Sequence, residues 1–82
     1  TFTIINQHEG RMRLYHLDLY RIEGGANEID ELGLDEMLEE SSAVVVIEWA
    51  ERLGARAIAG AYRVKIADLG KDERVLSIVL SL

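Results

Sequence analysis

Residues 44–48 read Val-Val-Val-Ile-Glu and form the clearest strand signal in the sequence. Four consecutive β-branched residues without alternation indicate a strand buried on both faces, as in a parallel sheet. Residues 14–18 read Leu-Tyr-His-Leu-Asp and have a similar form, a mostly apolar run that ends on a carboxylate. The terminal acids Asp18 and Glu48 are thirty residues apart, about one strand–helix–strand crossover. The two segments therefore predict parallel strands within an α/β fold.

The remaining pattern places further strands and short helices around these two segments. Strands are expected at residues 1–7, 11–19, 44–47, 62–66 and 76–80, with the last two forming an antiparallel hairpin. Two short acidic helices, capped by Asn27 and Asp35, are expected to lie over the sheet rather than form core. The predicted fold is a mixed sheet whose parallel strands end at Asp18 and Glu48, followed by the hairpin.

The composition indicates an ordinary globular protein in one small domain, residues 1–82. A chain of this size buries only about 60–65% of its unfolded surface, so an independent fold would be marginal. The sequence has no cysteine, which excludes disulfides and thiolate metal sites. It shows neither a signal peptide nor an apolar run of the roughly 18 residues that a membrane span needs. We therefore expect a cytoplasmic protein.

The formal net charge of −6 argues against a segment that grips nucleic acid by bulk electrostatics, because phosphate contacts need clustered lysine and arginine. The acids concentrate in residues 23–40, where no basic residue occurs. This stretch is interpreted either as a solvated helical face or as a docking surface for a basic partner.

The two strand-end acids are the first candidates for chemistry. If their strands are parallel neighbours, Asp18 and Glu48 stand at the carboxyl edge of the sheet, where ligands bind in open α/β folds. Two carboxylates there suit Mg²⁺, which takes oxygen ligands, waters and substrate phosphates. Either acid alone is also an ordinary way to end a strand. His16 is interpreted as a metal partner of Asp18 or as a hydrogen-bonded interior residue, and Trp49 as a stacking surface or as packing at the sheet edge.

Several short motifs together resemble those of one known family. Residues 15–21 (Tyr-His-Leu-Asp-Leu-Tyr-Arg) resemble the His-x-Asp-Leu-Tyr-Arg motif of the TsaE family, also called YjeE. Residues 31–36 (Glu-Leu-Gly-Leu-Asp-Glu), 46–50 (Val-Ile-Glu-Trp-Ala) and 1–3 (Thr-Phe-Thr) resemble its other conserved stretches, in the same order and with similar gaps. The resemblance covers residues 1–51, and beyond them it rests on strand pattern alone.

The resemblance implies part of a P-loop ATPase fold in a bacterial cytoplasmic protein. It implies a weak Mg²⁺-dependent ATPase, with Mg²⁺ and ATP as cofactors, that works with TsaD and TsaB in making threonylcarbamoyladenosine in tRNA. By motif matching, Asp18 and Glu48 look like the family's Mg²⁺-binding and catalytic carboxylates. Thr1 looks like a residue of its nucleotide-sensing switch, and Trp49 like the tryptophan beside its nucleotide site.

The sequence departs from the family pattern in two ways. The glycine-rich loop with its lysine and threonine, expected upstream, is not among these residues, and neither is the proline that the family usually has before its last strands. We therefore expect the chain to be the C-terminal part of the ATPase domain, inactive alone because its phosphate-binding loop is missing.

Two readings outside the ATPase class stay open on the sequence. One is a small acidic interaction module that docks a partner through residues 23–40 without catalysis. The other is a metal-dependent hydrolase that uses His16, Asp18 and Glu48 without a P-loop.

Overall fold

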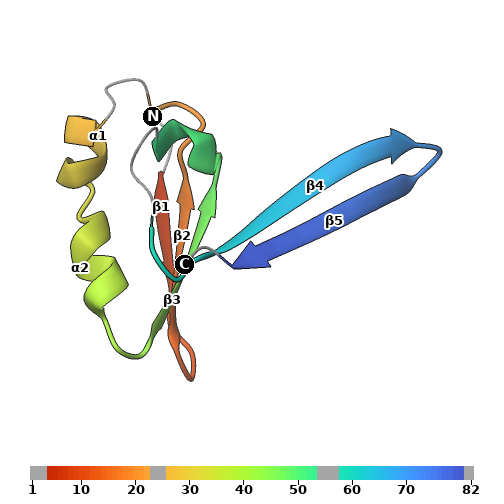
Figure 1. Ribbon diagram of the computed structural model, residues 1–82. Coiled ribbons are helices and arrows are strands. Elements are labelled where there is room, and N and C mark those ends of the chain that lie inside the picture. Colours follow the sequence, from red (N-terminus) through yellow and green to blue (C-terminus); the bar gives the residue numbers. More distant parts are fainter. Residues whose placement is uncertain (1–3, 23–25, 54–57, 81–82) are drawn as a thin grey trace.

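The computed structural model describes residues 4–22, 26–53 and 58–80 (Figure 1). The elements in chain order are β1 (Ile5–His8), β2 (Arg13–Asp18), α1 (Ala26–Glu31), α2 (Leu34–Glu39), β3 (Ala43–Glu48), the 3-10 helix η1 (Ala50–Leu53), β4 (Tyr62–Gly70) and β5 (Glu73–Leu80). The predicted mixed α/β architecture with an antiparallel C-terminal hairpin is confirmed. Within the described ranges, no helix is long and apolar enough to cross a membrane.

A three-stranded sheet in the order β1-β2-β3 forms the body of the molecule. β1 pairs with β2 antiparallel, and β2 pairs with β3 parallel, in a register that places Asp18 opposite Glu48. The chain crosses from β2 to β3 through α1 and α2, which lie together on one side of the sheet (Figure 1). The predicted pair of neighbouring parallel strands ending at these two acids is therefore confirmed.

The core lies between this face of the sheet and the two helices. Its buried members are Tyr15, Leu17, Leu19, Ile22, Ile29 and Leu34. The helices contribute Ile29 and Leu34, both fully buried, so the expectation that the acidic stretch stays out of the core is wrong. A short helix can supply a single apolar anchor to a core even when its other positions are acidic.

The helix starts differ from those predicted by one or two residues. α1 begins at Ala26 and α2 at Leu34, so Asn27 and Asp35 lie inside the first turns rather than at the caps. Gly33 is the residue before α2 and has a φ of 81°. A side chain at this left-handed position would clash with its own backbone, so glycine suits the junction between the helices.

The prediction that residues 44–47 form a strand buried on both faces is wrong, because the face of β3 away from the helices is exposed. Along β3 the side chains alternate between partly buried and exposed, with Val44 and Val46 44% and 45% exposed. The reason is that α1 and α2 cover only one face. The buried strand residues belong to β2 instead, at Tyr15 and Leu17.

The hairpin of β4 and β5 projects away from this body (Figure 1). All of its strand residues are exposed, and its turn is formed by Lys71 and Asp72, with φ values of 54° and 62°. The radius of gyration is 14.0 Å, above the roughly 12 Å of a compact domain of this length, which fits a projecting arm. One face of the arm is apolar, formed by the opposed pairs Tyr62–Leu80, Val64–Ile78 and Ile66–Leu76.

Candidate functional site

The candidate site is the carboxyl edge of β2 and β3, where Asp18 and Glu48 are register partners. Neighbouring strands are about 4.8 Å apart, so the two residues begin from adjacent backbone positions on one face. Backbone bonds hold both ends: the Asp18 N–H donates to Ile4 O at 2.9 Å, and the Leu19 N–H donates to Glu48 O at 3.1 Å. The predicted juxtaposition of the two acids is thus present in the fold.

Each carboxylate also has its own polar neighbour. Oδ1 of Asp18 accepts a hydrogen bond of 3.1 Å from the Tyr20 N–H. Oε1 of Glu48 lies 3.2 Å from Nε2 of His16, which shares the same face of β2 as Asp18. One oxygen of each carboxylate is therefore held in place at the rim.

The contact of His16 bears on the two roles that the sequence left open for it. Its side chain is 33% exposed and faces Glu48 across the strand pair, so it is a half-buried residue with a polar partner. Among residues 4–22, 26–53 and 58–80, no group of three histidine, cysteine or acidic side chains is arranged to hold a metal ion. The structure therefore gives no support to a hydrolase that uses His16, Asp18 and Glu48 as a ligand trio.

Directly after Glu48 the backbone turns sharply at Trp49. Its φ of 59° is left-handed, which is a rare conformation for a bulky side chain and one that clusters at functional sites. The Trp49 ring lies 4.7 Å from that of Tyr20, centroid to centroid and tilted by 58°, with the Arg52 guanidinium 6.0 Å from the Tyr20 centroid. Trp49 and Tyr20 are 46% and 49% exposed, so an aromatic surface stands beside the carboxylates.

Sequence reasoning gave Tyr20 no role. The available signal was its place two residues after Asp18, just past the end of β2, matched by Trp49 just past the end of β3. An aromatic residue after each of two paired strands would have predicted their contact.

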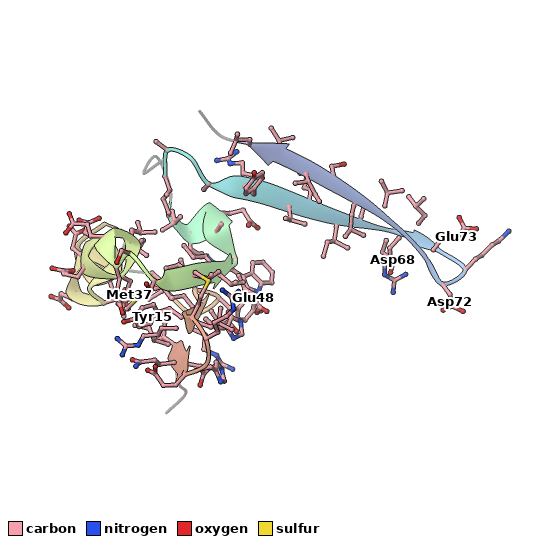
Figure 2. All side chains as sticks on the ribbon, turned by 90° about the horizontal axis from the view of Figure 1, so that it is seen from below. Tyr15, Met37, Glu48, Asp68, Asp72 and Glu73 are labelled. Atoms are coloured by element: carbon pink, nitrogen blue, oxygen red, sulfur yellow. The ribbon has the colours of Figure 1, made fainter. Side chains whose placement is uncertain are left out.

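A hollow between the end of β3 and the hairpin adjoins the carboxylate edge. Its lining comes from the end of β3 and the turn after it, including Glu48 and Trp49, and from Val64 and Ile66 of β4. Figure 2 places Glu48 on the sheet body and Asp72 far away at the hairpin tip. The acids at the tip are thus remote from the candidate site and serve as controls for it.

The acidic stretch, the alternative docking surface, is partly used inside the chain. Glu40 accepts hydrogen bonds from Arg13 at 2.8 Å and from the Tyr15 hydroxyl, at the edge of the sheet opposite to Asp18 and Glu48. The contact with the Tyr15 hydroxyl, together with the carboxylates of Glu9 and Glu40, raises the pKa of Arg13 above its ordinary value. Thr1, the predicted switch residue, lies outside the described residues.

These features define an α/β protein with paired carboxylates at the carboxyl edge of parallel strands, the edge at which such sheets bind ligands. The family model described as threonylcarbamoyl adenosine biosynthesis protein TsaE matches residues 1–76. The chain belongs to the TsaE family, as its motifs indicated.

Curated relatives agree with this assignment. A Bacillus subtilis protein named tRNA threonylcarbamoyladenosine biosynthesis protein TsaE is 36% identical over 78 residues, covering 94% of this chain and 47% of that protein. A Nostoc protein of the same name is 49% identical over 57 residues, covering 65% of this chain and 34% of that protein. The chain thus spans about a third to a half of the length of these relatives.

Proposed function

We propose that the protein carrying this chain is a cytoplasmic, Mg²⁺-dependent ATPase that serves the synthesis of threonylcarbamoyladenosine in tRNA together with TsaD and TsaB. The observation that carries the proposal is the pairing of Asp18 with Glu48 at the carboxyl edge of β2 and β3, in a chain of the TsaE family. An apolar strand followed by an acid is how many nucleotide hydrolases place a carboxylate that binds metal or orients water.

The two acids take different roles in this proposal. Asp18, whose Oδ1 is held by the Tyr20 N–H, acts mainly as a ligand of Mg²⁺. Glu48 is the carboxylate that orients the attacking water or shares the metal. Trp49 lies beside the nucleotide on the exposed aromatic surface, and Thr1 belongs to a nucleotide-sensing switch.

The donor set at this edge fits Mg²⁺. The ion takes oxygen ligands and is commonly held by one or two carboxylates, while waters and substrate phosphates complete its shell. Asp18 and Glu48 supply such oxygens from adjacent positions on one face. When bound, the ion neutralises charge on the phosphates; the chain's own contribution is to fix these two side chains at the rim.

The proposal assigns the phosphate cradle to other parts of the protein. The 82 residues contain no glycine-rich loop with lysine and threonine. Such a loop surrounds the phosphates with backbone N–H groups and supplies a cation. This chain accordingly contributes the carboxylate side of the nucleotide site.

The test is multiple-turnover formation of threonylcarbamoyladenosine on tRNA by TsaD and TsaB, supplied with ATP, Mg²⁺ and the full-length protein. We expect Asp18→Asn to stop sustained turnover and to raise the Mg²⁺ concentration needed for ATP hydrolysis. The matched control is Asp72→Asn, the same change at the exposed hairpin tip (Figure 2). If Asp18→Asn supports turnover as well as wild type does, the proposed site is wrong.

A further inference from the structure

The contact between His16 and Glu48 has no part in the roles proposed so far. Nε2 of His16 lies 3.2 Å from Oε1 of Glu48, and the side chains are 33% and 55% exposed. His16 pairs with Val46 in the parallel ladder, one step of the pleat before the Asp18–Glu48 pair. The histidine therefore approaches the carboxylate diagonally across the strands, from the side of the sheet body.

The two residues differ in how firmly their backbones are held. His16 is in the middle of the central strand β2, with Asn6 of β1 on one side and Val46 of β3 on the other. Glu48 is the last residue of β3, and the backbone changes to a left-handed conformation at Trp49 directly after it. The backbone of His16 is thus firmly held between two strands, whereas the Glu48 carboxylate depends on a neighbour to hold its orientation.

A half-exposed glutamate samples several rotamers, and holding it in one of them costs entropy that a single well-placed contact offsets. Glutamate has a long side chain, so an aimed carboxylate depends on a supporting neighbour more than the shorter Asp18 does. Asp18 has its own support, the Tyr20 N–H. For Glu48, His16 provides it.

We propose that His16 is a positioning residue that holds the Glu48 carboxylate in its working orientation for ATP hydrolysis. The inference rests on the proposed function, because it needs Glu48 to act on the nucleotide. The contact of Nε2 with Oε1 at 3.2 Å limits the rotation of the carboxylate. Loss of such a supporting contact typically lowers activity about 10–100-fold while the binding groups stay intact.

The experiment compares variants of the full-length protein by steady-state ATP hydrolysis, with nucleotide affinity and the thermal midpoint measured alongside. His16→Leu removes the donor, and His16→Gln restores an N–H on a side chain of similar reach. His8→Leu is the matched control, because His8 ends β1 and is exposed. We expect His16→Leu to lower kcat about 10-fold or more with KM near wild type, His16→Gln to recover most of it, and His8→Leu to have no effect.

A second comparison separates this inference from the function on which it rests. In a Glu48→Gln background, His16→Leu is expected to cause no further loss, because the two residues act as one unit. If Glu48→Gln is impaired but His16→Leu hydrolyses ATP like wild type, the positioning role is wrong and the proposed function stands. A Glu48→Gln variant with wild-type kcat overturns both. A His16→Leu variant that loses nucleotide affinity or thermal stability, without rescue by glutamine, makes His16 a structural residue and also overturns the inference.

Discussion

Tyr15 joins the core to the edge of the sheet opposite the candidate site. Its side chain is 8% exposed, and its hydroxyl donates to Glu40, while Arg13 binds the same carboxylate at 2.8 Å. Glu40 follows α2 directly and precedes β3. The hydroxyl and the guanidinium together hold the chain where it enters the strand that ends at Glu48.

This network gives a prediction for Tyr15→Phe. The ring stays in the core, but Glu40 loses a hydrogen bond, so the free energy of unfolding is expected to fall by about 1 kcal/mol. This loss is at the low end of the range for a hydrogen bond to a charged group. Glu40 is one-third exposed, so water replaces part of the lost hydrogen bond. Urea unfolding of the full-length protein measures the change. Tyr62→Phe, at a 71% exposed position, is the control and should be neutral; equal losses in both variants would contradict the account.

The site residues show which contacts a sequence can predict. Asp18 and Glu48 were identified because a local pattern, an apolar strand ending on an acid, occurs twice at crossover spacing. The contact of His16 with Glu48 depends on the exact register of β2 against β3, which the two patterns do not specify. The left-handed conformation of Trp49 could not be predicted from residue propensities either, because a bulky residue is unfavourable in that conformation.

At the scale of elements, α2 shows how a short acidic helix stabilises the sheet. Leu34 is fully buried, whereas Leu38, one turn further along, is 41% exposed. The helix thus contributes Leu34 to the core, packs the partly buried Met37 against it, and presents its acids to solvent.

Leu34 and Leu38 provide a matched test of how α2 packs on the sheet. Leu34→Ala removes buried methyl groups from a small core and is expected to lower the free energy of unfolding by about 2–5 kcal/mol. Leu38→Ala, the same change on the same helix, is expected to cost less than about 0.5 kcal/mol. Chemical unfolding of the full-length variants measures both. A cost at Leu38 equal to that at Leu34 would mean that α2 packs differently.

Element types were predictable here, and element environments were less so. The run of residues 44–47 predicted a strand correctly, but its burial on both faces depends on what covers the sheet, which the run does not encode. The hairpin was visible in the alternation of residues 62–66 and 76–80. Its direction away from the body was not, because the arm makes no core contacts that a local pattern would report.

At the scale of the whole molecule, a small helix-covered sheet bears a long arm, and the carboxylate edge adjoins the hollow between them. An isolated two-stranded hairpin is marginal in water. Opposed apolar pairs line one face of the arm, and Val46 extends this apolar lining onto the sheet body.

The distribution of charge predicts how the 82-residue chain behaves with nucleotide. Its candidate site offers carboxylates for a metal but no lysine-bearing loop for phosphates, and bare carboxylates repel a polyphosphate. Calorimetry with ATP and Mg²⁺ is expected to show no saturable binding up to millimolar nucleotide. Micromolar affinity would contradict the account and indicate a nucleotide site within these residues.

The most direct test of the central claim, that the Asp18–Glu48 edge acts in ATP hydrolysis, is single-turnover hydrolysis by full-length Glu48→Gln with TsaB and TsaD present. Glutamine keeps the size and much of the hydrogen bonding but removes the charge, so the loss should appear in the chemical step. We predict a rate lower by about 10²-fold or more, the scale of a lost acid–base group, with nucleotide affinity nearly unchanged. Glu73→Gln, at the far tip of the hairpin, should hydrolyse ATP like wild type (Figure 2). A wild-type rate in Glu48→Gln would contradict the claim and leave Glu48 as a strand-end acid with a structural role alone.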